Sequence, residues 1–541
     1  MTPSVMFSID QNCHSLWDVI PKLQALVVRG HRVRHFVEDV DVAFTAVGAS
    51  TDDNSLHFAR ERFYGSGGGD WGAAMFYSEF LSRLPVELRH WERMLGMKIA
   101  AVARRLGRSV GDLYDEFSPG DNWQLIGPSY VGDRHHHRLI GDLTVAEVQP
   151  FIRELIAIAE RDMLERFPAR ASQLRLADWF ANERRRLDSL LARSREGCLV
   201  DLYRLWIKEI LGTSVDLDLT SSLTAAGACP DHTALLDVFV SRYDLAAGLY
   251  AEAIAHTDSD VHPLHTEEGE LPIFAVFLRD GRLVRAGAAL DGDAVRIADR
   301  RFPLAHGRLP MEALKQAGIR CLAGKALLLA IQARLGECGA PLALPHCGSF
   351  YMPAAIALQQ KLSAHNLLPA PVHPVVRVRL RLLDRMASLD TPIRLPAHLA
   401  AAMGCEELPA CRLAAACPDI AAEATARLDS MTTDAGRQQW QRDALPETFH
   451  EISALNHRRR KLAREDPKSA DIRHLSHSVR RLEADILAAT LQQIASDWQV
   501  SHLEYWDSRG AIMPWCIALD GEHFYDEVIA RADIYEETPP M

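Results

Sequence analysis

A strand, a helix and a second strand open the chain, and this order constrains the fold more than any other feature of the sequence. Residues 5–9 form a strand-like run, residues 15–29 have the spacing of a helix, and residues 33–37 return to a strand-like pattern. Strands that alternate with helices are typical of α/β proteins. We therefore expect an α/β fold.

The composition is that of an ordinary globular protein: 48% of the 541 residues are hydrophobic, 24% charged and 7% aromatic. At about 150 residues per domain, the length predicts two to four modules. Collagen-like, disordered and small disulfide-stapled classes are excluded. The chain has 60 Lys and Arg against 72 Asp and Glu, a net charge of −12. We expect no nucleic-acid partner, because proteins that bind nucleic acid normally carry a basic face.

The sequence predicts a cytoplasmic protein. Residues 1–10 lack the basic start and apolar run of a secretory signal, and no run of about 18 uncharged apolar residues predicts a membrane span. The ten cysteines include no C-x-x-C pair and are typical of a reduced cytosolic protein. Cys405, Cys411 and Cys417 recur every six residues, which fits neither a zinc knuckle nor one helical face, so we interpret them as small core residues.

The pattern of strands and helices divides the chain into four regions. Charged and apolar residues are interleaved in long helices from residue 145 to 211, with Pro168 between the first two. Strand signals then return, and Asp280-Gly281 joins two strand-like runs in the strongest hairpin signal of the chain. We predict an N-terminal part of the α/β core at 1–144, a helical insertion at 145–212, a second part of the core at 213–395 and a C-terminal helical region at 396–541.

Within the last region, residues 446–498 are predicted to form an antiparallel helical hairpin. One helix has apolar residues at alternating spacings of three and four, as in the seam of a coiled coil: Ile472, Leu475, Val479, Leu482 and Ile486. The other helix is marked by Phe449, Ile452, Leu455 and Leu462. The basic run at residues 457–461 lies on this hairpin, and we interpret it as a charged outer face.

The first candidate site is the glycine-rich run at residues 65–72. Successive glycines let backbone N–H groups approach an anion, and a helix N-terminus follows them. Gly67, Gly68, Gly69 and Asp70 are therefore candidate binding residues for a phosphate or carboxylate. The run lacks the Lys-Ser/Thr of a P-loop and the spacing of a dinucleotide fingerprint. The alternative interpretation is a flexible surface loop.

The second candidate lies in residues 127–142. Asp133, His135 and His137 alternate, so they could converge on one face of an extended backbone and serve as catalytic residues. Tyr130 is a candidate substrate-binding residue of the same segment. No H-E-x-x-H motif accompanies them, and we predict no metal. The alternative is a solvated polar loop.

The third candidate lies in residues 342–351, where a short buried strand is followed by polar residues. Ligands of open α/β sheets bind beyond the carboxyl ends of the strands, which is where His346, Ser349 and Tyr351 are expected. Cys347 could be a nucleophile beside His346, but adjacent residues usually point apart, so we favour substrate binding. An ordinary turn is the alternative. Lys325, at a predicted helix start, could meet a phosphate, although a solvated first-turn lysine is the simpler interpretation.

The layout of residues 230–540 resembles, remotely, the family of cysteine-adding enzymes of bacillithiol synthesis (BshC). The resemblance rests on the Asp-Gly hairpin at 274–284, the G-x-P-L-x-L-P segment at 339–345, the helical hairpin at 449–498 and the tail at 510–529. The family's G-Q-Q-x-G and acidic-Asp-His-Asp-Phe motifs are absent. Residues 67–72 and 133–137 occupy their places.

The resemblance implies a Rossmann-like core with helical insertions, akin to class I aminoacyl-tRNA synthetases, and a coiled coil that forms a homodimer. It also implies thiol biosynthesis, through amide formation between cysteine and a glucosamine–malate conjugate. We expect a small-molecule ligase or transferase that joins an amino-acid-like group to a polar amino-sugar-type acceptor. His135 or His137 would move a proton, and Asp133 would orient that imidazole or the incoming amine. A nucleotide is the cofactor to test. The alternatives are a non-catalytic scaffold and a metal-dependent hydrolase.

Overall fold

Six strands form the central sheet of the computed structural model, which describes residues 5–9, 17, 19–41, 88–109, 113, 139–257, 261–347, 349, 351–501, 503 and 512–537. Their order is β13-β10-β9-β1-β2-β3, and all neighbours are parallel except β13, which runs antiparallel to β10. The strands are β1 (Val5–Ile9), β2 (Arg32–Val37), β3 (Val215–Leu219), β9 (Leu342–Pro345), β10 (Val375–Arg379) and β13 (Asp533–Glu536).

The strand order reverses between β1 and β9. From β1 the chain adds β2 and β3 on one side of the sheet, and later adds β9 and β10 on the other. This is the doubly wound order of a Rossmann-like sheet, in which ligands bind beyond the carboxyl ends of the strands at the point of reversal. The expected α/β fold is confirmed.

Helices cover both faces of the sheet because its buried side chains alternate between two cores. Met6, Val33 and Val37 pack on one face into a core to which several helices contribute, and four of these helices precede β3 in the chain. These are α1 (Ile20–Val28), α6 (Val145–Arg166), α7 (Arg170–Arg193) and α8 (Leu199–Leu211). Phe7 and Phe36 pack on the other face into a core whose four longest helices are different ones. These are α10 (Pro230–Ser241), α11 (Tyr243–Ala255), α13 (Ala326–Gln332) and α14 (Met352–Ala364).

A second, antiparallel sheet lies in the chain between β3 and β9, with the order β7-β6-β5-β4-β8. The predicted hairpin is confirmed as β4 and β5, and Asp280 and Gly281 both have positive φ, as a two-residue hairpin turn requires. The sheet comprises β4 (Glu270–Arg279), β5 (Arg282–Asp291), β6 (Ala294–Ile297), β7 (Arg300–Pro303) and β8 (Ile319–Gly324). Short elements near it are α9 (Thr220–Leu223), η2 (Thr266–Glu268) and α12 (Met311–Gln316).

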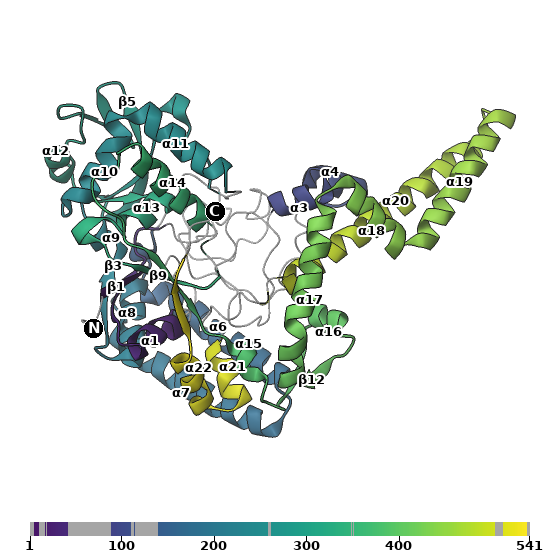
Figure 1. The fold of residues 1–541 in the computed structure, drawn as a ribbon, viewed down its shortest axis with the longest axis horizontal. Coiled ribbons are helices and arrows are strands. Elements are labelled where there is room, and N and C mark those ends of the chain that lie inside the picture. The colour runs from purple at the N-terminus through teal and green to yellow at the C-terminus, as the bar shows by residue number, and fades with distance from the viewer. Residues whose placement is uncertain are drawn as a thin grey trace.

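The C-terminal helices form a separate lobe with its own apolar core, to which two early helices also belong. The lobe contains α3 (Leu88–Leu95), α4 (Ile99–Leu106), α16 (Ala397–Met403), α17 (Ala410–Met431), α18 (Asp434–Ala444), α19 (Pro446–Glu465) and α20 (Ala470–Ser501). The predicted hairpin is confirmed: α19 and the first part of α20 pair and project from the lobe as an arm (Figure 1). No helix in the described ranges is both long and apolar enough to cross a bilayer.

The end of the chain returns to the central sheet. Arg175 of α7 donates hydrogen bonds to three carbonyls at the C-terminal end of α21, those of Ile517, Ala518 and Leu519, at 2.7–3.0 Å. A guanidinium there satisfies carbonyls that a helix end leaves unpaired.

The remaining elements are η1 (Ile140–Asp142), η3 (Gly336–Cys338), α15 (Leu382–Met386), β11 (Pro392–Arg394), β12 (Glu407–Pro409), α21 (Ile512–Leu519) and α22 (Glu522–Ala530).

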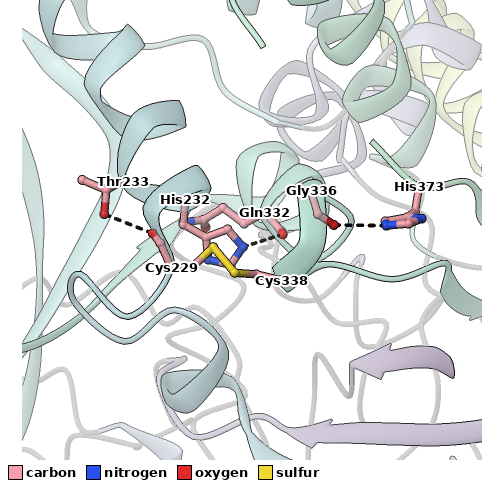
Figure 2. The surroundings of a disulfide bond; sticks show 7 residues. All are labelled: Cys229, His232, Thr233, Gln332, Gly336, Cys338 and His373. Carbon is pink, nitrogen blue, oxygen red and sulfur yellow. Dashed lines mark hydrogen bonds between the residues drawn. A yellow bond between two sulfur atoms is a disulfide. The ribbon is translucent and has the colours of Figure 1, made fainter. Parts of the chain in front are cut away.

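A disulfide joins Cys229, the residue before α10, to Cys338 in η3, with their Cα atoms 6.4 Å apart (Figure 2). His373 Nε2 also lies 3.1 Å from the carbonyl oxygen of Gly336 in the same turn. The disulfide corrects the expectation that the cysteines are reduced. Cys417 is buried as expected, but Cys405 is exposed in the connection between α16 and β12, and Cys411 is half-buried because a six-residue spacing turns it to another face of α17 than Cys417.

Candidate functional site

The carboxyl edge of the central sheet is the candidate site, and β9 brings His346 and Cys347 to it directly. The backbone N–H of His346 donates to the carbonyl of Val378 on the neighbouring β10 at 2.8 Å. The residue after the strand is therefore still held by the sheet. This places the imidazole beside the reversal of strand order between β1 and β9, as predicted from the sequence.

His346 pairs with Tyr535 of β13. Its Nδ1 lies 2.5 Å from the Tyr535 hydroxyl, and the two rings meet edge to face with centroids 6.1 Å apart. Either group can donate, depending on the imidazole tautomer. The Tyr535 side chain is 41% exposed although it is large and aromatic. An imidazole and a phenol are thus hydrogen-bonded to each other at an accessible position on the sheet edge.

Arg377 of β10 supports this pair from within the sheet. It is only 6% exposed, and it makes a two-pronged ion pair with Glu537, at 2.9 and 3.0 Å. Its Nη1 also donates to the carbonyl of Pro345 at 2.9 Å, directly before His346. A bidentate guanidinium–carboxylate pair fixes orientation as well as distance. Arg377 therefore positions the end of β9, on which His346 sits, against the end of β13.

Ser349 and Tyr351 lie in the turn from β9 into α14. Ser349 has a φ of +54° and its carbonyl accepts a hydrogen bond from the backbone N–H of Met352 at 2.8 Å. Tyr351 is the residue before α14. Its half-buried side chain packs against the core that contains Phe7 and Phe36. The sequence correctly places both after β9. The positive φ of Ser349 and the hydrogen bond to its carbonyl form the turn, so the ordinary-turn interpretation describes the backbone of Ser349 well.

Carboxylates gather at the end of β2, where they bond to their own loop, to α9 and to the second sheet. Asp39 accepts from the backbone N–H of Ser221 at 2.8 Å and from the Ser221 hydroxyl. Glu38 accepts from two backbone N–H groups, at 2.8 and 3.0 Å. Asp41 pairs with Arg285 of β5, whose guanidinium lies 4.0 Å from the Phe274 ring centroid.

Burial and then the charges of Asp41 and Asp39 raise the pKa of Glu38 well above its usual value. Burial also raises the pKa of Asp39, against hydrogen bonds from Ser221. Lys325 lies at the same junction. It forms an ion pair with Glu270 and sits 5.1 Å from the Phe274 ring, so the structure gives this lysine a structural partner instead of a solvated position.

Ser8 and His35 form a buried polar pair on the face of the sheet that α1 covers. The two residues are register partners of β1 and β2, and His35 Nδ1 lies 3.0 Å from the Ser8 hydroxyl. Among the described residues, none is a hydrogen-bond partner of the buried His35 Nε2. Burial, and then the charge of Lys22, hold the pKa of His35 well below its usual value, against the hydrogen bond with Ser8. This pair was missed in the sequence, where an alternating V-R-H-F-V strand gives no sign of it.

The other predicted site residues lie outside the described residues. They are Gly67, Gly68, Gly69, Asp70, Tyr130, Asp133, His135 and His137. Tyr535, Arg377 and Glu537 were not predicted. The sequence does hold a signal for Arg377, because Arg377, Arg379 and Arg381 alternate as on one face of a strand, whereas nothing local marks Tyr535. Within the described ranges, no group of three or more His, Cys, Asp or Glu side chains could hold a metal ion.

Comparison with known proteins adds no name to this geometry. No family model matches the chain, and no curated protein matches it.

Proposed function

We propose that the protein is a small-molecule ligase or transferase whose substrate binds at the carboxyl edge of the central sheet. In this proposal it joins an amino-acid-like group, with cysteine as the first candidate, to a polar amino-sugar-type acceptor. The observation that carries the proposal is the His346–Tyr535 pair beside the reversal of strand order. The resemblance of the sequence supplies the choice of substrates.

The residues at this edge suit formation of a carbon–nitrogen bond. An amine that attacks an activated acyl group displaces the activating group, which ATP would supply in a ligase, and it must also lose a proton. An imidazole can accept that proton from the amine and return it to the leaving group near neutral pH. The Tyr535 hydroxyl is hydrogen-bonded to His346, so it can relay that proton. It can also donate a hydrogen bond to a substrate oxygen. Arg377 would act as a positioning residue through its bond to the Pro345 carbonyl. Asp133, His135 and His137 keep their predicted catalytic roles and residues 67–70 their anion-binding role, and ATP is the nucleotide to test.

A thermal-shift panel tests the proposal on the purified protein, with cysteine, ATP and glucosaminyl-malate as ligands, singly and together. A ligand at about 100 times its Kd stabilises the fold by about 2.7 kcal/mol. We expect a shift with the wild type and its loss in Tyr535→Phe and His346→Asn. The control is His523→Asn, which changes a surface histidine that pairs with Asp520.

A panel without any shift would contradict the ligase proposal and favour the scaffold alternative. A shift that survives both site variants would contradict the location of the site, because the ligand would then bind elsewhere. Equal losses in the control would point to a general change in stability. The unliganded variants should melt at the same temperature as the unliganded wild type, and this comparison guards against that interpretation.

The arm is proposed to pair two copies of the chain. None of the 20 residues of α19 is fully buried, and its seam side chains, such as Phe449 and Ile452, are only half-covered by α20. Two such hairpins would cover each other, as in a four-helix arrangement. Light scattering should give twice the 60.3 kDa of one chain. A mass of one chain at micromolar concentration would contradict the dimer.

We also propose the cytoplasm as the location, although the disulfide opposes a reducing compartment.

A further inference from the structure

Positive charge is concentrated in the outer part of the arm, residues 456–481, here called the basic arm tip. It contains seven arginines and two lysines against three acidic residues, a net charge of +6. The whole chain carries −12, so the other 515 residues carry −18. The overall charge therefore says nothing about what this segment binds, because it averages over two regions of opposite sign.

The structure brings two separate runs of arginine together on the arm. α19 contributes Arg458, Arg459, Arg460 and Arg464, and α20 contributes Arg473, Arg480 and Arg481. The two helices are antiparallel and joined by a short turn, so both runs occupy the outer half of the same projection (Figure 1). All seven side chains are exposed except Arg459, which is half-buried.

These arginines outnumber the acidic residues of the tip and are not paired with them. In the described part of the chain, none of the seven makes an ion pair, and the nearest pair at the tip is Lys461–Glu465 at 3.9 Å. The run Arg184-Arg185-Arg186 on α7 shows the usual situation, since each member bonds to Glu160, Asn182 or Glu183. Like charges crowded on one helical projection repel one another and destabilise it. A polyanionic partner would remove that repulsion.

The chemistry of the tip favours phosphate over an acidic protein. Protein interfaces are anchored by buried aromatic or apolar side chains. No large hydrophobic side chain of the basic arm tip is among the exposed ones in the described structure, because the apolar residues of the tip lie in the seam. Arginine predominates over lysine, and its planar fork matches phosphate oxygens in pairs. The longer run, on α20, spans about 12 Å at 1.5 Å per residue. A nucleic-acid duplex presents about seven phosphates over that length.

We propose that the basic arm tip binds nucleic acid through its sugar–phosphate backbone. The inference is independent of the proposed ligase site, which lies on the other lobe. It replaces both the interpretation of residues 457–461 as a solvated outer face and the expectation of no nucleic-acid partner. Binding of this kind is insensitive to base sequence and falls steeply with salt, because each phosphate contact releases condensed counterions.

Fluorescence anisotropy with the full chain tests this inference, using labelled RNA and DNA duplexes of roughly 20 base pairs between about 50 and about 200 mM KCl. We expect binding by the wild type with a steep negative salt slope. The variants R458Q/R460Q and R480Q/R481Q should each weaken binding about tenfold or more and reduce the slope by about 1.8, or 0.9 per lost contact. The matched control R184Q/R185Q, an equal loss of charge on α7, should stay within about twofold.

Three results would overturn the inference. The first is no binding of either duplex at the lowest salt concentration. The second is equal weakening by the α7 control and the arm variants, since binding would then follow overall charge. The third is stronger competition by poly-L-glutamate than by unlabelled duplex, which would identify an acidic protein as the partner. A preference for RNA or DNA alone would support the inference and identify the sugar.

Discussion

Loss of the Cys229–Cys338 disulfide should lower the free energy of unfolding by about 2–5 kcal/mol. The two cysteines are separated by 109 residues, and the whole second sheet lies between them. In the chain-entropy account, a cross-link that closes a loop of about 100 residues stabilises a fold by about 4.7 kcal/mol. Urea unfolding of the oxidised wild type and of C229S/C338S, followed by circular dichroism, measures the difference.

The exposed Cys405 provides the control for this prediction. C405S should unfold at the same urea concentration as the wild type. Alkylation in denaturant without reductant should modify eight of the ten cysteines. Modification of all ten, with equal stability of the wild type and C229S/C338S, would show that Cys229 and Cys338 are thiols, as expected from the sequence, and would remove the objection to a reducing compartment.

Acidification below about pH 6.5 should destabilise the wild type more steeply than His35→Asn. The folded protein holds the pKa of His35 well below 6.5, mainly by burial, whereas the unfolded chain has an ordinary histidine. Between the two values the unfolded state binds one more proton, so the free energy of unfolding falls as the pH falls. This loss amounts to at most about 1.4 kcal/mol per pH unit, and it is absent above the unfolded value.

Asparagine can keep the bond to Ser8 but does not titrate, so the comparison isolates the proton on His35. Glu38 acts in the opposite direction, because its raised pKa makes stability fall as the pH rises from its usual value near 4.5. The pH dependence of the wild type combines both effects, so the effect of His35 has to be measured as the difference between the wild type and His35→Asn. His523→Asn, which alters an exposed histidine, should reproduce the wild-type slope. An unchanged slope in His35→Asn would refute the assignment.

Elements with a strong local pattern could be predicted from the sequence. The strand at residues 5–9 has the predicted bounds, and the Asp280-Gly281 turn is the predicted one because two positive φ angles favour these residues. At residues 322–335, by contrast, the local pattern predicts one helix, which is wrong. Residues 319–324 instead form β8, since pairing with β4 overrides a continuous apolar run that has no clear period. Local patterns also do not reveal that β4 to β8 form a sheet of their own.

Only one member of the central pair of the candidate site, His346, could be predicted from the sequence. His346 could be placed because polar residues follow a short buried strand, and parallel sheets bring such positions to one edge. Its partner Tyr535 lies 189 residues further along, and Glu537 lies 160 residues from Arg377. These pairs form because β13 returns as an antiparallel edge strand beside β10. No spacing rule in the sequence anticipates that return.

Hydrogen exchange with and without cysteine, ATP and glucosaminyl-malate together is the most direct test of a ligand site at the carboxyl edge. The ligands should slow amide exchange in peptides that contain His346 and Tyr535, whereas peptides from the arm should exchange at the same rate in both samples. The same protection should disappear in Tyr535→Phe. Protection confined to the second sheet or to the helical lobe would contradict the account, because the ligand would then bind away from the reversal of strand order.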